Sequence, residues 1–350
     1  MYAITEELSR VSGIKSFRGE LYYTINGVLT VNGDSIIEGV EGYSFWFIHD
    51  GIYFFTEEGE RRFKKDEVSQ LLSVPLFVGT EIGGNILCKS GFRRENRKWK
   101  WQLGEFDLES YSEVRELPFE NYTVELVVAD IGIGYFDKNK ISALDIKGSK
   151  IKWELVLDQF GEVQLQRILG VYQNELLVVL GEHVLLSINV ETGEILHKWH
   201  ELKGFEINAT YKDELPSASN FVLDEAVGKL IGAFHTYYFE IDLVSREIIY
   251  IQLEEELTSH SIRNLKSVSN NPFTSTHLYL TADVTLEEFP NTDLNAVLAL
   301  NRETKKIDWV HTFKESGIGT NIPQITDTHL YMLDLEGTLH IFKKETTPLV

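Results

Sequence analysis

The sequence contains a single cysteine, Cys88, among its 350 residues. One thiol cannot form an internal disulfide, so the chain lacks the disulfide framework typical of small exported domains. The N-terminal residues Met1 to Arg10 contain neither the basic and apolar segments of an export signal nor a cysteine that could carry a lipid. No apolar run approaches the roughly 20 residues that a membrane-spanning helix needs. We therefore expect a cytoplasmic location and no membrane partner.

Positive charge is also scarce. Lys and Arg number 33 against 54 Asp and Glu, which gives a formal net charge of −21. Such a surface repels phosphate backbones and anionic lipid headgroups, so we expect no nucleic-acid partner and favour a basic protein. The hydrophobic fraction of 43% and the charged fraction of 25% are sufficient for a large core and are not those of a disordered chain.

The common catalytic and ligand-binding motifs are absent from the sequence. There is no GxSxG, HExxH or HxH spacing, and Gly132 and Gly134 are not followed by the Gly-Lys pair of a phosphate-binding loop. His197 and His200 are three residues apart on an expected strand, where their side chains point to opposite faces and cannot chelate one metal ion. We expect no catalytic residues, no cofactor and no metal site.

Internal repeats are the main evidence for the fold. The clearest unit runs from Val184 to Trp199 and consists of an apolar strand, a Glu-Thr-Gly turn and a second strand that ends in Trp. Three other segments share this layout: Ile141 to Trp153, Tyr238 to Tyr250, and Val297 to Trp309. The repetition predicts a series of similar hairpins.

An Asp or Asn closes the first strand of each unit and is expected to bond to the backbone of the following turn. The first strands are apolar on both faces, which indicates strands that are covered on both sides. The second strands alternate, so that Ile and the terminal aromatic residue are predicted on one face. These residues are Asp145, Asn189, Asp242 and Asn301 in the turns, and Ile151 with Trp153, Ile248 with Tyr250, and Ile307 with Trp309 in the second strands.

Weaker hairpins bring the number of units to eight, with tight turns expected at Asn26-Gly27, Asp50-Gly51 and Glu336-Gly337. The first two units are only 24 residues apart, which is too close for two full blades of about 40 to 50 residues. The sequence therefore predicts an all-β fold, a β-propeller of about seven four-stranded blades, with six to eight allowed, in a single domain over residues 1–350. The N- and C-terminal strands are expected to close one composite blade. Only Asp66 to Leu72 suggests a helix.

The unit that ends at Trp199 resembles the repeat of the pyrroloquinoline-quinone-type (quinoprotein dehydrogenase-like) propellers, in which an apolar strand, Leu-Asp, a Thr-Gly turn and a terminal Trp follow one another. The units that end at Trp153 and Trp309 are similar to the same pattern. The resemblance implies the propeller fold. Quinone-dependent enzymes of this family are exported and have a disulfide between adjacent cysteines, and its assembly lipoproteins have a lipidated N-terminal cysteine. This chain departs from both patterns, so neither function is carried over.

Most of the six tryptophans end an outer strand, and we interpret them as packing between blades rather than as a ligand platform. Two acidic segments with interleaved aromatic residues, 104–120 and 283–293, are interpreted as loops that link or extend the blades. Carboxylates there would steer a basic partner and aromatic side chains would anchor it; the alternative is that both segments are ordinary solvated loops. The predicted partner-binding residues are Glu109, Tyr111, Glu113, Phe119, Glu287, Glu288 and Phe289.

The composition and the absence of catalytic motifs lead us to expect a non-catalytic protein-binding propeller. In a sharper form of this hypothesis, the partner is a basic toxin or nuclease and the chain is its immunity-type inhibitor, because an acidic surface can occupy a cleft built for nucleic acid. Two alternatives remain open: a hydrolase or lyase with a site in the central channel, and a sensor that binds a small molecule or glycan.

Overall fold

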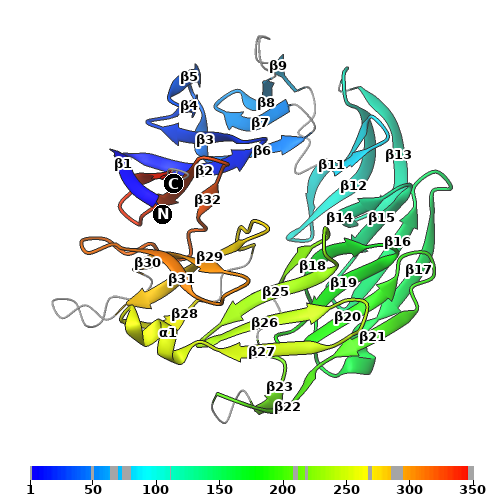
Figure 1. The fold of residues 1–350 in the computed structure, drawn as a ribbon. Coiled ribbons are helices and arrows are strands. Elements are labelled where there is room, and N and C mark those ends of the chain that lie inside the picture. Colours follow the sequence, from blue (N-terminus) through cyan, green and yellow to red (C-terminus); the bar gives the residue numbers. More distant parts are fainter. Residues whose placement is uncertain are drawn as a thin grey trace. The chain divides into compact units, whose positions relative to one another are not determined.

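The structure is a computed structural model that describes residues 2–48, 51–63, 70–72, 80–110, 112–207, 212–216, 220–266, 270–284 and 295–345. Strands account for 64% and helices for 4% of the chain, so the all-β prediction is confirmed. The chain is a β-propeller of four-stranded blades, and the described residues contain eight of them (Figure 1). Eight lies within the predicted range of six to eight.

The chain divides into two compact units, Met1–Tyr43 with Ser219–Val350, and Ser44–Ala218. The prediction of a single domain remains a prediction. The first unit contains four blades, three of which are formed by consecutive antiparallel strands. These three are β2 (Val11–Phe17), β3 (Glu20–Ile25), β4 (Val28–Val31) and β5 (Asp34–Ile37); β24 (Val222–Asp224), β25 (Lys229–Phe234), β26 (Tyr237–Asp242) and β27 (Ile248–Gln252); and β28 (Ile262–Leu265), β29 (His277–Val284), β30 (Ala296–Asn301) and β31 (Ile307–Thr312).

The fourth blade of this unit is the composite blade, in the strand order β1-β34-β33-β32. Its strands are β1 (Tyr2–Leu8), β32 (Gln324–Ile325), β33 (His329–Leu333) and β34 (Leu339–Lys344). β1 pairs antiparallel with β34 from Tyr2 opposite Lys344 to Leu8 opposite Leu339. The predicted closure of one blade by strands from both ends of the chain is therefore confirmed.

The second unit also contains four blades of consecutive strands, together with a separate two-stranded sheet. The strands are β6 (Glu41–Ile48), β7 (Gly51–Thr56), β8 (Gly59–Phe63) and β9 (Gln70–Leu71); β10 (Thr80–Ile82), β11 (Asn85–Glu95), β12 (Lys98–Asp107) and β13 (Glu113–Glu120); β14 (Thr123–Val128), β15 (Ile131–Tyr135), β16 (Lys140–Asp145) and β17 (Lys150–Val156); β18 (Leu165–Tyr172), β19 (Glu175–Leu180), β20 (Val184–Asn189) and β21 (Ile195–Trp199); and the pair β22 (Glu201–Glu206) and β23 (Lys212–Glu214).

The predicted turn chemistry is confirmed at each repeat. Asn189 Oδ1 accepts hydrogen bonds from the backbone N–H groups of Glu191 (2.9 Å) and Thr192 (3.0 Å), and Asn301 Oδ1 binds two turn N–H groups at 3.0 Å. Asp145 and Asp242 accept turn N–H groups in the same way. The middle strands between these turns, such as β20, are buried along most of their length, as their apolar sequences predict.

One detail of the strand prediction is wrong. Ile151 and Trp153 were expected on one face of β17, but Trp153 is 8% exposed and Ile151 is 43% exposed. The register shifts between the pairs Ala143–Trp153 and Leu144–Ile151, so a β-bulge at Lys152 reverses the alternation. The same shift occurs before Trp309.

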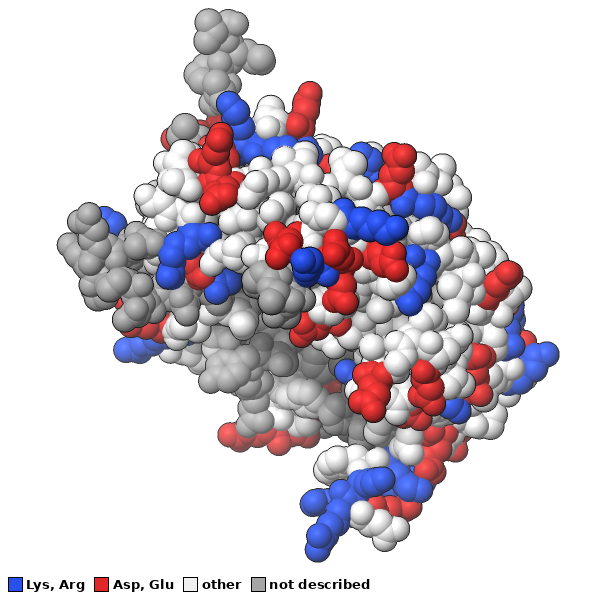
Figure 2. Space-filling model, turned by 90° about the horizontal axis from the view of Figure 1, so that it is seen from below, with Lys and Arg blue, Asp and Glu red and all other residues white. Residues whose placement is uncertain are grey.

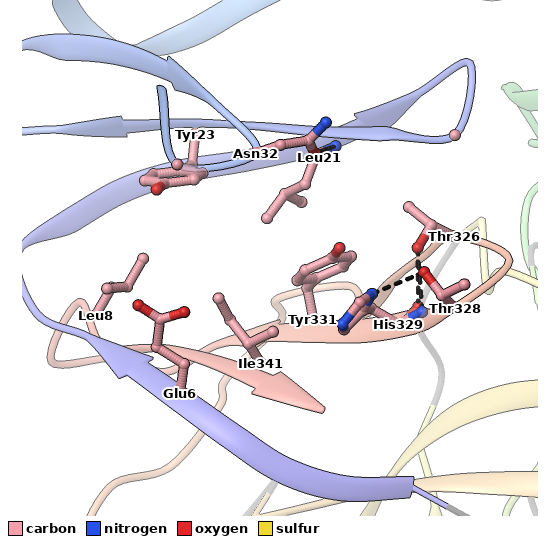
Figure 3. A pocket seen from close by; sticks show the side chains of 12 residues that line it. Glu6, Leu8, Leu21, Tyr23, Asn32, Thr326, Thr328, His329, Tyr331 and Ile341 are labelled. Carbon is pink, nitrogen blue, oxygen red and sulfur yellow. Dashed lines mark hydrogen bonds between the residues drawn. The ribbon is translucent and has the colours of Figure 1, made fainter. Parts of the chain in front are cut away.

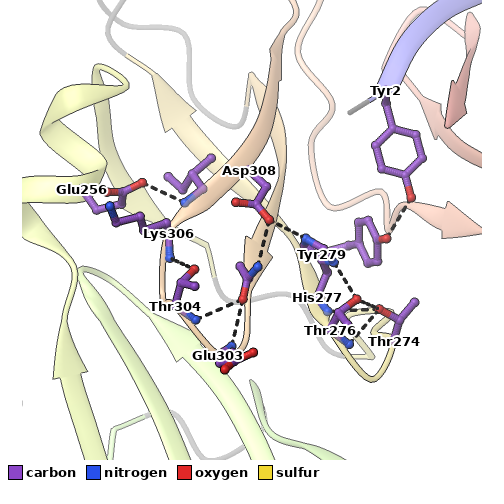
Figure 4. Close-up of polar contacts among 12 residues, drawn as sticks. Tyr2, Glu256, Thr274, Thr276, His277, Tyr279, Glu303, Thr304, Lys306 and Asp308 are labelled. Carbon is purple, nitrogen blue, oxygen red and sulfur yellow. Dashed lines mark hydrogen bonds and ion pairs between the residues drawn. The ribbon is translucent and has the colours of Figure 1, made fainter. Parts of the chain in front are cut away.

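The helical prediction also needs correction. The described part of Asp66 to Leu72 contains the short strand β9, and residues 66–69 lie outside the described residues. Among the described residues the α-helix is α1 (Glu254–Ser259), and a 3₁₀ turn covers Leu157–Phe160. In α1, Glu256 has a structural role, because its Oε1 accepts the backbone N–H of Ile307 at 2.8 Å (Figure 4). No helix in the described ranges is long and apolar enough to cross a membrane.

Candidate functional site

The acidic segment 104–120 lies within one blade rather than between two. Its first residues end β12, its last residues form β13, and the two strands pair from Gln102 opposite Glu120 to Phe106 opposite Glu113. Along β13 the buried residues Leu117 and Phe119 alternate with exposed ones, as expected for the last strand of a blade. The sequence interpretation mistook this half-exposed strand for an acidic loop.

The structure brings two of the predicted partner-binding residues together at an exposed turn. Glu109 and Glu113 are exposed on either side of the β12–β13 turn, where Asp107 Oδ1 accepts the backbone N–H groups of Glu109 (3.2 Å) and Ser110 (2.7 Å). Phe119 is only 5% exposed and packs against Tyr122 in the core, so its ring is not accessible to a partner. Four predicted residues lie outside the described residues: Tyr111, Glu287, Glu288 and Phe289.

A second candidate site is a groove between the composite blade and the β2–β5 blade, both in the first unit. We call it the inter-blade groove; its volume is about 480 Å³. Figure 3 shows side chains of the composite blade facing those of β3 across it. The apolar and aromatic lining residues are Leu8, Leu21, Tyr23, Tyr331 and Ile341, and the polar ones are Glu6, Asn32, Thr326, Thr328 and His329.

Strand register explains which side chains reach the inter-blade groove. Glu6 lies opposite Ile341, and Ile341 lies opposite Tyr331, so these three residues form a row across three strands of the composite blade. Directly opposed residues of an antiparallel sheet share one face. A register shift between Ile4 and Glu6 marks a β-bulge, which places Glu6 rather than its neighbour in the row. From the other side, β3 contributes Leu21 and Tyr23, two positions apart and on the same face.

The electrostatics of the inter-blade groove favour a cation. Burial raises the pKa of Tyr23, and the carboxylates of Glu6 and Asp34 raise it further, so this phenol is neutral at physiological pH. Burial and the nearby Lys343 lower the pKa of His329 below its usual value of 6.5, so the imidazole is also neutral there. Glu6 is then the one charged side chain in the described lining, and it is close enough to Tyr23 to raise the pKa of that phenol. A carboxylate beside aromatic faces is a suitable environment for a Lys or Arg side chain.

Buried ion pairs elsewhere in the first unit connect the blades. Arg302 Nη2 lies 2.6 Å from Asp224 Oδ2, and Lys305 Nζ lies 3.1 Å from Glu240 Oε1, so the β30–β31 turn is tied to the preceding blade. Burial raises the pKa of Glu240, but hydrogen bonds from Lys229, Tyr238 and Lys305 outweigh this effect and lower the pKa to about 2. Each charge is paired and hydrogen-bonded, which indicates a structural role.

One polar cluster has the residue types of a hydrolytic triad. His277 Nε2 lies 2.9 Å from Asp308 Oδ2, and His277 Nδ1 lies 2.8 Å from the Thr276 hydroxyl (Figure 4). The same Thr–His contact recurs at Thr328 and His329, at 2.8 Å, in an equivalent turn. There the residue across the strand is Lys343, which cannot orient an imidazole as a carboxylate does. We therefore assign the contact to the turn and not to catalysis.

Sequence reasoning did not identify the inter-blade groove, although two signals pointed to it. The predicted composite blade already placed the N-terminal strand beside the C-terminal hairpin, and the sequence Thr-Xaa-Thr-His-Leu-Tyr occurs both at Thr274–Tyr279 and at Thr326–Tyr331. The second copy contributes four of its six residues to the groove. The β-bulge in β1 that turns Glu6 towards the groove could not be predicted, because a bulge has no fixed sequence signature at this position.

No protein-family model matches the chain, and no curated protein matches it in sequence. Its fold is similar to that of several solved structures. The C-terminal WD40 domain of Sif2 has a TM-score of 0.60 and 10% identity, covering 99% of each chain. Sqt1 of Saccharomyces cerevisiae has a TM-score of 0.59 and 9% identity, covering 99% of this chain and 98% of that chain. BamB from Moraxella catarrhalis has a TM-score of 0.52 and 12% identity, covering 98% of this chain and 100% of that chain.

At such identities the similarity concerns the fold alone. It confirms the β-propeller predicted from the repeats, and it does not single out the pyrroloquinoline-quinone-type repeat among propeller repeats.

Proposed function

We propose that the chain is a non-catalytic propeller that binds a basic protein in the cytoplasm. The observation that carries the proposal is the inter-blade groove, where the Glu6 carboxylate lies at an open cavity walled by Tyr23 and Tyr331. A Lys or Arg side chain of a partner would enter the groove and reach this carboxylate. The net charge of −21 would attract such a partner from a distance.

Charge distribution refines this proposal. On the face drawn in Figure 2, acidic and basic side chains are interspersed and do not form one continuous acidic field. Long-range attraction therefore would not by itself fix where the partner binds, and a local site with defined chemistry is needed. The inter-blade groove supplies such a site in the first unit, and the turn carrying Glu109 and Glu113 supplies a more exposed one in the second unit.

The sharper form of the proposal is inhibition of a basic toxin or nuclease. An enzyme that acts on a polyanion has a cationic cleft, and a carboxylate-rich protein surface can occupy that cleft in place of its substrate. The support for this form is the charge alone. It predicts that the partner has a toxic or nucleolytic activity and that this chain suppresses that activity in a one-to-one complex.

The test begins with affinity purification of the tagged full chain from its native cell, followed by binding measurements on the purified partner. Glu6→Gln removes the charge of the inter-blade groove and is expected to weaken binding about tenfold or more, because a charged partner group would lose its counter-ion. Glu336→Gln is the matched control, since Glu336 is an exposed glutamate in the same blade outside the groove. An acidic partner, or equal effects of the two variants, would contradict the proposal.

A further inference from the structure

The β11–β12 hairpin of the second unit is longer than the blade that contains it. β11 has 11 residues and β12 has 10, whereas the other described strands have at most eight. Within the described residues, β10 pairs with β11 only as far as Leu87, and β13 pairs with β12 only as far as Gln102. Beyond these points the two strands pair with each other, up to Glu95 opposite Lys98. We call residues 88–101 the β11–β12 arm (Figure 1).

The β11–β12 arm has one ion-paired face. Arg93 lies opposite Lys100, and both bind the carboxylates of Glu95 and Glu120, at N–O distances of 2.7 to 3.2 Å. These four residues compensate one another, so this face needs no external partner. Their charges cancel within the network, and they brace the base of the arm against β13.

The other face of the arm carries aromatic side chains and cations. Arg94 lies directly opposite Trp99, and Trp101 lies two positions further along the same face. Lys89 Nζ lies 4.8 Å from the centre of the Trp101 ring. The Trp101 indole N–H donates to the Tyr122 carbonyl at 3.1 Å, which fixes this ring to the next blade. Trp99, in contrast, is 60% exposed.

The composition of the arm is unfavourable for folding alone. Arg94, Arg97 and Lys98 are exposed and have no ion pair within the described parts of the chain, and like charges this close on a two-stranded ribbon repel one another. Cations on an exposed edge do protect a sheet from aggregation. Protection from aggregation does not account for Trp99, because an exposed indole beside these cations promotes association. An indole flanked by uncompensated cations is typical of a binding surface.

We propose that the tip of the β11–β12 arm, residues 94–99, binds an acidic protein segment. An apolar residue of that segment lies on Trp99, and its carboxylates bind Arg94, Arg97 in the turn, and Lys98, which lies opposite Glu95 on the other face. This surface is independent of the proposed basic partner and has the opposite charge. Nucleic acid fits less well, because the described part of the arm offers only three cations without an ion pair and the chain has a net charge of −21, whereas a polyanion is bound through many phosphate contacts. The short, locally positive arm instead complements a few carboxylates.

The experiment measures fluorescence anisotropy of a labelled 12-residue peptide of alternating Glu and Tyr, titrated with the full chain. The triple variant Arg94→Glu, Arg97→Glu, Lys98→Glu and the single variant Trp99→Ala are each expected to weaken binding about tenfold or more. The matched control Lys138→Glu, Lys150→Glu, Lys344→Glu changes the net charge equally at exposed lysines outside the arm and should bind almost as wild type does. Because all these positions are exposed, circular dichroism melting should be unchanged.

Three results would overturn this proposal. The first is no detectable binding of the acidic peptide by the wild-type chain. The second is an equal loss of binding in the arm variant and in the lysine control, which would reduce the effect to net charge. The third is a different occupant: tighter binding of a 12-nucleotide oligo(dT), or self-association in analytical ultracentrifugation that Trp99→Ala abolishes. None of these measurements depends on the inter-blade groove. If the acidic-segment proposal fails, the proposed binding of a basic protein is unaffected, and if binding of a basic protein fails, the acidic-segment proposal is unaffected.

Discussion

The indole N–H of Trp153 donates to the backbone carbonyl of Val190 at 2.8 Å and thereby joins the β14–β17 blade to the β18–β21 blade. Trp309 makes the equivalent bond to Tyr2 at 2.8 Å, and Trp101 makes it to Tyr122 at 3.1 Å. In each case the Trp lies on an outer strand and the acceptor belongs to the following blade or precedes its first strand. Trp101, Trp153 and Trp309 thus each form a hydrogen bond from one blade to the next.

Replacement of Trp153 by Ala is expected to lower the free energy of unfolding by about 3 to 5 kcal/mol, because a large buried ring and its hydrogen bond are both lost. Trp199→Ala should have a similar effect, and Trp309→Ala a smaller one, since Trp309 is only half-buried. Urea unfolding monitored by circular dichroism measures the change. Trp99→Ala serves as the control and should change stability by less than about 0.5 kcal/mol. Equal stability of the Trp153 and Trp99 variants would show that the repeat aromatics do not hold the blades together.

Gly193 is required at its position by the same contact. Its φ of 75° lies in the left-handed region, and a Cβ there would lie 2.7 Å from the ring of Trp153. Gly193→Ala should therefore destabilise the protein by more than the roughly 1 kcal/mol of backbone strain alone. If steric overlap is the cause, the effect should shrink when Gly193→Ala is combined with Trp153→Ala. A double-mutant cycle with strictly additive effects would contradict this explanation.

The repeat pattern was sufficient to predict the fold class, the Asp and Asn turns and the composite blade, because each depends on local turn chemistry or on strand pairing that recurs. The blade count was less certain, since the β2–β5 blade contains two strands of only four residues, β4 and β5, joined by tight turns. This blade covers only Val11 to Ile37, which is much shorter than the 40 to 50 residues expected for a blade. The β2–β5 blade and the β6–β9 blade were therefore counted as one in the prediction of about seven blades.

The site was harder to predict than the fold, and the reason is strand register. A bulge of one residue determines whether Ile151 or Trp153 is buried, and another determines that Glu6 faces the inter-blade groove. Phe119 was assigned to a loop surface because β13 combines acidic residues with two buried positions. The sequence of the β11–β12 arm is locally basic, in contrast to the net charge of −21 from which a basic partner is predicted.

Glu240 makes the stability of the first unit depend on acid pH. Its folded-state pKa of about 2 lies below the usual value of 4.5, so the stabilisation it provides is fully present above pH 4.5. It is lost as the pH falls from about 4.5 towards 2, because the unfolded chain takes up the proton first. Glu240→Gln should be less stable than wild type at pH 7, where Lys229 and Lys305 lose their counter-ion, and the difference should diminish between pH 5 and pH 2. Thermal melts at four pH values test this, with Glu225→Gln in the same blade as the control; a difference that stays constant with pH would refute the assignment.

Association with the proposed basic partner depends on two kinds of residue, exposed carboxylates that attract it and aromatic side chains that hold it. Charges at a rim act mainly on the encounter, whereas buried contacts act mainly on dissociation. Reversing Glu109 and Glu113 to Lys should therefore slow association, and raising the ionic strength from 0.15 to 1 M should do the same, since the Debye length falls from about 8 to about 3 Å. Tyr331→Ala opens the wall of the inter-blade groove and should speed dissociation, with a loss of about 2 kcal/mol or more, which is about thirtyfold in affinity. Tyr111→Ala should act in the same way if the predicted acidic segment also provides an anchor.

Surface plasmon resonance at both salt concentrations resolves the two rate constants. Because Tyr331 is largely buried, its variant is accepted only if its melting temperature stays above the assay temperature, and Glu6→Gln provides a second, less disruptive change in the same groove. An association rate independent of salt would remove the electrostatic part of the proposal. Faster dissociation in Tyr111→Ala, with no change in either groove variant, would move the anchor from the first unit to the β12–β13 turn of the second, and the basic partner would then be recognised there.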